Sequence, residues 1–192
     1  NVRSQRAVEK LGAVRAGEGL LSLGTSGVLF VMTDRYLPNP ASAVHAFCHA
    51  LPGRWHQMSV MLSAANGLQW VTSLVGLGGE AALLERVEAL SDAQRNRAPL
   101  FLPYLSGERT PHNDAHATGA FFGMDNETDA ARLGHAVIEG VGFGLADGLQ
   151  ALRDGGTTVG RLALVGGGAR SAHWAQLLAD TLDIELQTVD GA

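Results

Sequence analysis

The spacing of apolar residues changes along the chain, and these changes divide it into strands and helices. Two apolar runs, 19–23 and 28–33, lie either side of a short polar stretch and predict a β-hairpin. Alternation of apolar and polar residues in 54–62 predicts a third strand. After this strand the apolar spacing lengthens to that of a helix, which predicts helices over 63–74 and 78–90.

The second half of the chain starts with a buried apolar run, 98–105, which Pro103 interrupts, and a long polar loop, 106–119. The longest helix follows. Capping residues at 126–129 precede apolar residues at every third or fourth position as far as Leu152, and "RDGG" then supplies a glycine stop. The remaining segments are predicted to be a strand, a helix and a final strand, at 161–167, 171–182 and 184–189.

The order of these elements predicts the fold class. Three leading antiparallel strands followed by alternating helices and strands indicate an α/β fold, with a mixed sheet and helices on its faces. A chain of 192 residues can bury a full core, as one large domain or two small ones. Its 46% hydrophobic and 17% charged residues are typical of a globular protein, and no internal repeat or linker stands out.

Charge and composition exclude several classes of protein. A net charge of −5 argues against general nucleic-acid binding, and no apolar run is long enough to predict a membrane span. Cys48 is the single cysteine, so an internal disulfide is excluded and a reducing, cytoplasmic setting is favoured.

Gly24-Thr25-Ser26-Gly27, here called the hairpin loop, joins the first two predicted strands. Backbone N–H groups in a tight glycine-containing turn can form a concave site for an anion, and two hydroxyls add donors. The loop has no lysine, so it is not a Walker-type phosphate loop. From local chemistry alone, an ordinary hairpin turn is the favoured interpretation.

A second glycine-rich stretch, Gly166 to Ala169, here called the glycine loop, follows a predicted strand and precedes a helix that begins near Ser171. A strand–turn–helix unit of this kind presents helix N–H groups to a ligand. The stretch partly matches the dinucleotide fingerprint, and Asp190 lies at the spacing of the acidic ribose contact. That fingerprint belongs to the first strand–helix unit of a sheet, whereas this unit is the last, so the match is interpreted as coincidence.

Other residues have chemistry of their own, but ordinary structural roles are favoured for them. "HAFCH" at 45–49 lacks the further ligands of a zinc site, and His112 and His116 fit a solvated loop. Glu139 on the long helix is predicted to be a paired, buried carboxylate rather than a catalyst. The three tryptophans are expected in the core: Trp55, Trp70 and Trp174.

Five stretches together resemble the FGGY family of carbohydrate kinases, most closely its xylulose-specific members. They are "LLSLGTSGV", "AVHAFCHALPGRWHQMSVMLSAANGLQW", "FLPYLSGERTPHNDAHATGAFFGM", "HAVIEGVGFGLADGL" and "LVGGGARSAHWAQLLAD". One signature of the family runs from Gly119 to Glu139, with Arg132 standing where a polar or acidic residue is usual.

The resemblance implies a fold of the hexokinase–actin kind, in which two ribonuclease-H-like domains flank a cleft. Residues 19–192 resemble the C-terminal, nucleotide-binding domain, without the family's final glycine- and alanine-rich helix. Residues 1–18 are interpreted as a divergent or truncated N-terminal segment. The implied partners are a small sugar, the missing N-terminal kinase domain and, for a homodimer, a second copy.

The resemblance also implies site residues and cofactors. ATP with Mg²⁺ would bind between the two loops, the hairpin loop at the β- and γ-phosphates and the glycine loop at the adenosine. The nucleotide contacts carried over are Gly24, Thr25, Ser26, Gly27, Ala65, Gln69, Gly166, Gly167, Gly168, Ala169 and Ser171. No catalytic or metal-binding residue is assigned. The family's base is an aspartate in a Gly-Asp-Asn-Ala stretch before the hairpin loop, but the first aspartate here is Asp34.

Three functions therefore stay open. The first is the nucleotide-binding half of a kinase for D-xylulose, inactive alone, with ribulose, gluconate or glycerol as other substrates. The second is a non-catalytic kinase-like module, which the missing base motif favours. The third is a dinucleotide-binding protein, which depends only on Gly166–Gly168.

Overall fold

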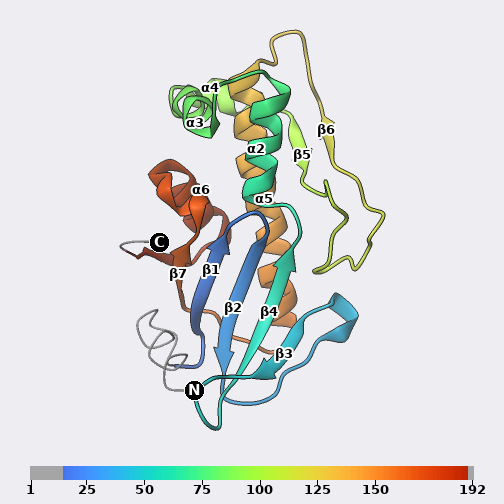
Figure 1. Ribbon diagram of the computed structural model, residues 1–192, viewed down its shortest axis with the longest axis vertical. Coiled ribbons are helices and arrows are strands. Elements are labelled where there is room, and N and C mark those ends of the chain that lie inside the picture. The colour runs from blue at the N-terminus through green and yellow to red at the C-terminus, as the bar shows by residue number, and fades with distance from the viewer. Residues whose placement is uncertain (1–14, 190–192) are drawn as a thin grey trace.

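A six-stranded mixed sheet lies at the centre of the computed structural model, which describes residues 15–189 (Figure 1). Its strand order is β3-β4-β2-β1-β7-β8. The three pairs from β3 to β1 are antiparallel, and β7 and β8 continue the sheet parallel to β1. The strands are β1 (Glu18–Leu23), β2 (Gly27–Thr33), β3 (His45–Cys48), β4 (Trp55–Met61), β7 (Arg161–Val165) and β8 (Glu185–Thr188).

The helices gather around one long helix, α5, which runs along a face of the sheet and beyond its end (Figure 1). A separate two-stranded ribbon, β5 with β6, packs beside it. The predicted α/β class with a mixed sheet is confirmed. These elements are α2 (Ala65–Leu74), α3 (Glu80–Glu88), α4 (Asp92–Arg95), β5 (Leu100–Leu102), β6 (Ala120–Phe122), α5 (Ala130–Asp154) and α6 (Ala172–Leu182), with short 3₁₀ turns η1 (Pro40–Ser42) and η2 (Gly167–Arg170).

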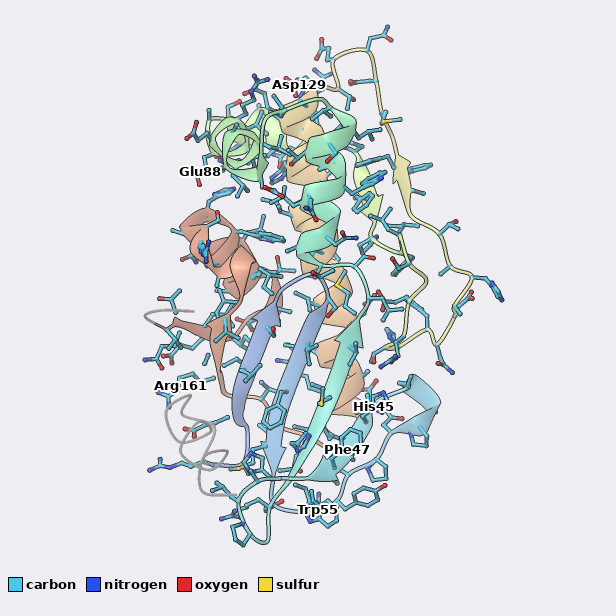
Figure 2. All side chains as sticks on the ribbon, in the orientation of Figure 1. His45, Phe47, Trp55, Glu88, Asp129 and Arg161 are labelled. Atoms are coloured by element: carbon cyan, nitrogen blue, oxygen red, sulfur yellow. The ribbon has the colours of Figure 1, made fainter. Side chains whose placement is uncertain are left out.

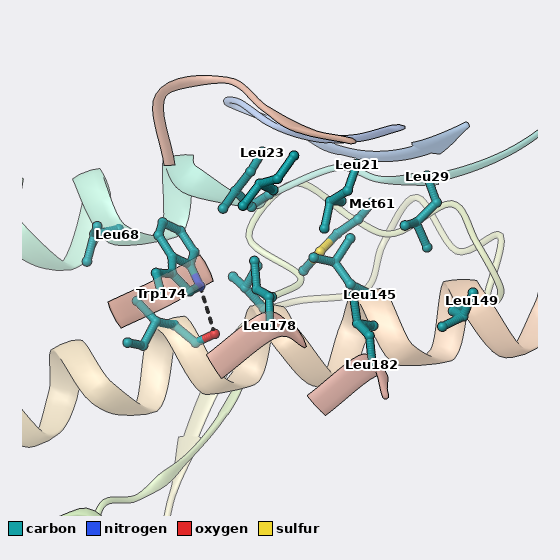
Figure 3. Packing of buried hydrophobic residues seen from close by; sticks show 14 of the residues in the cluster. Leu21, Leu23, Leu29, Met61, Leu68, Leu145, Leu149, Trp174, Leu178 and Leu182 are labelled. Carbon is teal, nitrogen blue, oxygen red and sulfur yellow. Dashed lines mark hydrogen bonds between the residues drawn. The ribbon is translucent and has the colours of Figure 1, made fainter. Parts of the chain in front are cut away.

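The core lies between the sheet and the two helices α5 and α6 (Figure 3). Alternate residues of β1 and of the first part of β2 face it, although the apolar run of each strand is nearly continuous. Trp174 on α6 is fully buried, and its indole Nε1–H donates to the carbonyl oxygen of Ile138 over 3.2 Å. The strand residues Leu21, Leu23, Leu29 and Met61 meet Leu145, Leu149, Leu178 and Leu182 of the helices.

The sequence signals for helix ends are confirmed. The Asp129 carboxylate accepts from the N–H of Arg132 at the start of α5, and Gly155 follows its last residue. The Ser171 hydroxyl likewise accepts from the N–H of Trp174 at the start of α6. Among residues 15–189, no helix has the length and hydropathy needed to cross a lipid bilayer.

Some predictions about burial were wrong. In the run 98–105 only part of the chain is buried, because Leu100 and Leu102 lie on the outer face of the ribbon and are 55% and 49% exposed. Trp55 is half-buried and Trp70 is 36% exposed, so of the three tryptophans only Trp174 belongs to the core.

Three elements were not anticipated from the sequence: β3, β6 and the single-turn helix α4. In β3 both faces are half-buried or exposed, so its residues show no apolar alternation. Figure 2 shows His45 and Phe47 of β3, with Trp55 of β4, at the end of the sheet farthest from α3.

Removal of the Trp174 ring is expected to destabilise the fold strongly. Trp174→Ala leaves a cavity between α6 and β1 and removes the bond to Ile138, at a cost of about 3–5 kcal/mol of unfolding free energy. Trp70→Ala is the matched control, because its ring stacks on Phe101 and Phe121 near the surface and contributes about 1 kcal/mol. Urea unfolding of both variants measures the difference. Equal losses would show that Trp174 is not a core anchor.

Candidate functional site

The hairpin loop and the glycine loop lie against each other. They follow β1 and β7, which pair in parallel, so both strands end at the same edge of the sheet. Gly166 adopts φ +100°, and a Cβ on it would lie 2.7 Å from the carbonyl oxygen of Leu23 and 3.2 Å from the nitrogen of Gly24. Glycine is therefore required at this contact, both for the conformation and for the space.

The carbonyl groups of the hairpin loop are held by the start of α2. The N–H of Ala65 donates to the oxygen of Gly24, and the N–H of Ala64 donates to the oxygen of Thr25, both over 2.9 Å. Within residues 15–189, no acceptor pairs with the backbone N–H groups or hydroxyls of Thr25 and Ser26. The loop therefore presents unpaired donors, as an anion site requires.

The three glycines of the glycine loop have different surroundings. A Cβ on Gly168 would lie 2.5 Å from Cδ2 of Leu23 and 3.1 Å from the ring of Trp174, so packing excludes a side chain there. A Cβ on Gly167 would meet no atom within 4 Å. Packing therefore requires Gly166 and Gly168 to be glycine, whereas Gly167 borders open space.

A pocket of about 580 Å³ opens between the two loops and helices α2, α3 and α6. This volume is within the usual range for small-molecule sites. Six of the residues predicted to contact a nucleotide line it: Thr25, Ala65, Gln69, Gly167, Gly168 and Ser171.

The other five predicted residues do not line this pocket: Gly24, Ser26, Gly27, Gly166 and Ala169. Three of them, Gly27, Gly166 and Ala169, take part in packing or in closing the loops. Gly27 is buried, and a Cβ on it would lie 3.0 Å from Leu145 and 3.2 Å from Ala64. The N–H of Ala169 donates to the oxygen of Gly166 and closes the glycine loop. Asp190, the acidic residue of the dinucleotide pattern, lies outside the described residues.

That α3 contributes to the site was not predicted from the sequence. Glu80, Glu85 and Glu88 of this helix line the pocket, and Arg170, which directly follows the glycine loop, also contributes. Figure 2 shows Glu88 at the end of α3 that faces α6. On an amphipathic helix these carboxylates appear as an ordinary solvent face, and only the tertiary arrangement shows what they border. The pocket therefore has carboxylates on α3 and unpaired donors at the hairpin loop.

A group of titratable residues lies behind the pocket, between α5 and the start of α6. His135 is almost fully buried, and burial, together with the charges of Arg95 and His173, lowers its pKa to about 4. Its Nε2 lies 3.9 Å from Oε1 of Glu139, whose pKa burial raises. Burial also lowers the pKa of His173. At neutral pH His135 is therefore uncharged, and its contact with Glu139 is not an ion pair.

In the part of the chain that the structure describes, no group of three or more His, Cys, Asp and Glu side chains could hold a metal ion. His45 and Cys48 belong to β3, and the ring of His45 stacks on Phe47. In the long polar loop, Nε2 of His112 lies 2.9 Å from the hydroxyl of Tyr104.

Comparison with known proteins places the chain among sugar kinases. Residues 19–192 match the C-terminal domain model of the FGGY family of carbohydrate kinases. The xylulose kinase of Escherichia coli (strain K12) is 51% identical over 171 residues, which are 88% of this chain and 35% of that protein. The chain thus spans about a third of the length of this curated relative.

Solved structures show the same similarity. The crystal structure of a xyloylose kinase from Brucella ovis matches 96% of this chain and 38% of its own, with a TM-score of 0.90 and 45% sequence identity. A gluconate kinase from Lactobacillus acidophilus shares the fold at a TM-score of 0.81 and 24% identity, over 94% of this chain and 37% of its own. The predicted actin-like kinase fold is therefore confirmed.

Loss of stability in mild acid is expected from the buried imidazole of His135. Its pKa is near 4 when folded and about 6.5 when unfolded, so the unfolded state binds more protons between these values. The unfolding free energy that depends on neutral His135 is therefore present in full above pH 6.5 and is lost as pH falls toward 4. His135→Leu should therefore flatten the dependence of unfolding free energy on pH in this window, measured by urea unfolding. An unchanged slope would contradict the neutral, buried state of His135.

Proposed function

Because the chain belongs to the FGGY family of carbohydrate kinases, we propose that it is the nucleotide-binding half of an ATP-dependent xylulokinase. The reaction would transfer the γ-phosphoryl group of ATP to the 5-hydroxyl of D-xylulose. The observation that carries the proposal is the pocket in which the hairpin loop and the glycine loop meet. D-xylulose is favoured because the Escherichia coli relative, a xylulose kinase, is 51% identical.

The residues of the pocket fit ATP. Its volume suits a nucleotide, and the unpaired N–H group and hydroxyl of Thr25, which lines the pocket, suit phosphate oxygens; the unpaired donors of Ser26 lie next to it in the hairpin loop. The absence of a side chain on Gly167 lets a ligand approach the backbone closely. Carboxylates on α3 repel phosphates but accept hydrogen bonds from ribose hydroxyls or a base amine. These features support a binding mode with the triphosphate at Thr25 and the adenosine between α3 and α6.

The groups of this chain would act by positioning. Bound ATP supplies the phosphoryl group, and Mg²⁺ would be held by its phosphates and by water, as is usual for this ion. Backbone donors at Thr25 and Ser26 would fix the phosphates and stabilise their charge, which is the main contribution of a protein to phosphoryl transfer. Closure of a second domain over the pocket would exclude water.

The general base would come from outside this chain. Asp34, its first aspartate, directly follows β2, which begins at the hairpin loop and is seven residues long. At about 3.4 Å per residue, this strand separates Asp34 from the loop by about 20 Å. The chain alone is therefore expected to bind the nucleotide without phosphorylating a sugar. A module that has kept nucleotide binding but no catalysis is the second candidate, which the missing base motif favours.

Nucleotide binding to this chain is expected to depend on Gly167 and Thr25. Gly167→Trp and Thr25→Trp fill the pocket, and calorimetric titration with Mg-ATP and Mg-ADP should show saturable binding for the unmodified chain and none for either variant. Gly160→Trp is the matched control, since a Cβ there also meets no atom within 4 Å but lies at the opposite end of β7. Equal affinities for Gly167→Trp and Gly160→Trp would refute this site.

Joining this chain to an N-terminal kinase domain tests the reaction. With the N-terminal part of the Escherichia coli xylulose kinase fused before residue 19, we expect phosphorylation of D-xylulose, while ribulose, gluconate and glycerol react at least about tenfold more slowly. The same fusion carrying Thr25→Trp is the control. A folded fusion that binds Mg-ATP without any turnover would favour the non-catalytic module. Faster turnover of another sugar would change the assigned substrate.

A further inference from the structure

The long polar loop, 106–119, contains a buried carboxylate that neither the core nor the pocket explains. Glu108 is only 3% exposed. Its Oε1 accepts from the N–H of Leu62 over 3.0 Å and from the N–H of Arg109 over 2.7 Å, whereas its Oε2 has no partner among the described residues. Burial raises the pKa of this carboxyl. Burial of a carboxylate costs stability unless hydrogen bonds or an ion pair compensate it, and here only Oε1 is hydrogen-bonded.

The contacts of Glu108 complete the edge of β4. β3 pairs with β4 only from Trp55 to Met58, so the edge is unpaired beyond that point. The polar loop supplies hydrogen bonds to this unpaired part of β4. The N–H of Thr110 donates to the oxygen of Val60, and the hydroxyl of Thr110 accepts from the N–H of Val60. Glu108 accepts from the N–H of Leu62, so the loop takes the place of a pairing strand here.

Leu62 connects this edge to the hairpin loop. Two residues after Leu62, the N–H of Ala64 donates to the oxygen of Thr25 over 2.9 Å, and that of Asn66 donates to the same oxygen over 3.4 Å. Ser63, which lies between Leu62 and Ala64, is fully buried. The position of Leu62 therefore sets the position of the Thr25 carbonyl, and through it the direction of the N–H groups of the loop.

We propose that Glu108 is a positioning residue for the phosphates: by fixing Leu62, it holds the hairpin loop in the conformation that presents its unpaired donors. The role rests on the proposed function, because the loop's ligand there is a nucleotide phosphate. What matters is the acceptor oxygen Oε1 rather than the negative charge, which would repel a phosphate. Glutamine can supply the same acceptor, and alanine cannot.

The test compares ATP with adenosine, which lacks phosphates. Glu108→Ala should weaken Mg-ATP binding about five- to tenfold, the scale of one lost hydrogen bond, with adenosine affinity unchanged. Glu108→Gln should bind both as the unmodified chain does. Thr110→Val is the matched control, because it removes another side-chain hydrogen bond to the edge of β4, the one from the N–H of Val60, farther from the hairpin loop, and should change neither affinity. Equal weakening of ATP and adenosine, or equal weakening by Gln and Ala, would overturn the proposal.

Amide hydrogen exchange in the nucleotide-free chain gives a second readout that does not depend on binding. The N–H groups of Ala64 and Asn66 should exchange faster in Glu108→Ala than in Thr110→Val. If Glu108→Ala does not fold, Glu108→Asp replaces it. The aspartate side chain is shorter by one methylene group, so its carboxylate cannot reach the N–H of Leu62, and exchange should again be faster than in Thr110→Val. If the unmodified chain binds neither ATP nor adenosine, the proposed function fails. Equal exchange rates in the two variants would then still overturn the role of Glu108.

Discussion

The close approach of two chain segments at the ends of β1 and β7 determines the rest of the site. Parallel pairing of these strands brings Leu23 and Gly166 together, and the lack of a side chain on Gly166 permits backbone-to-backbone contact. Gly168 then packs on Leu23 and on the ring of Trp174, which anchors α6 to α5. The side of the pocket that the two loops form is therefore held by the same contacts that hold the core.

The sequence predicted those parts of the molecule that have a strong period or a local signal. The apolar runs of β1 and β2, the caps of α5 and α6, and the two glycine-rich loops all depend on neighbouring residues, so they were found without tertiary information. Resemblance to a kinase family was needed to bring the two loops into one site, because their 140-residue separation leaves no local trace.

What could not be predicted depends on packing between distant segments. The outward position of Leu100 arises because β5 turns only Phe101 toward α2 and α5. The carboxylates of α3 resemble any solvated helix face until α6 is placed opposite them. Glu108 lies in a polar loop without periodicity, and its burial follows from the unpaired edge of β4. In each case the signal is the identity of a neighbour far away in sequence.

The different surroundings of the three glycines have a consequence for engineering. Substitution of Gly166 or Gly168 disturbs the backbone or the core, so selection for stability and selection for function act together there. At Gly167 the two are separable, because no protein atom occupies the space beside it. A small side chain at this position would reshape the pocket without loss of folding. Under the proposed nucleotide-binding role, such a side chain would exclude the unmodified nucleotide and admit an analogue that lacks the atoms the side chain displaces.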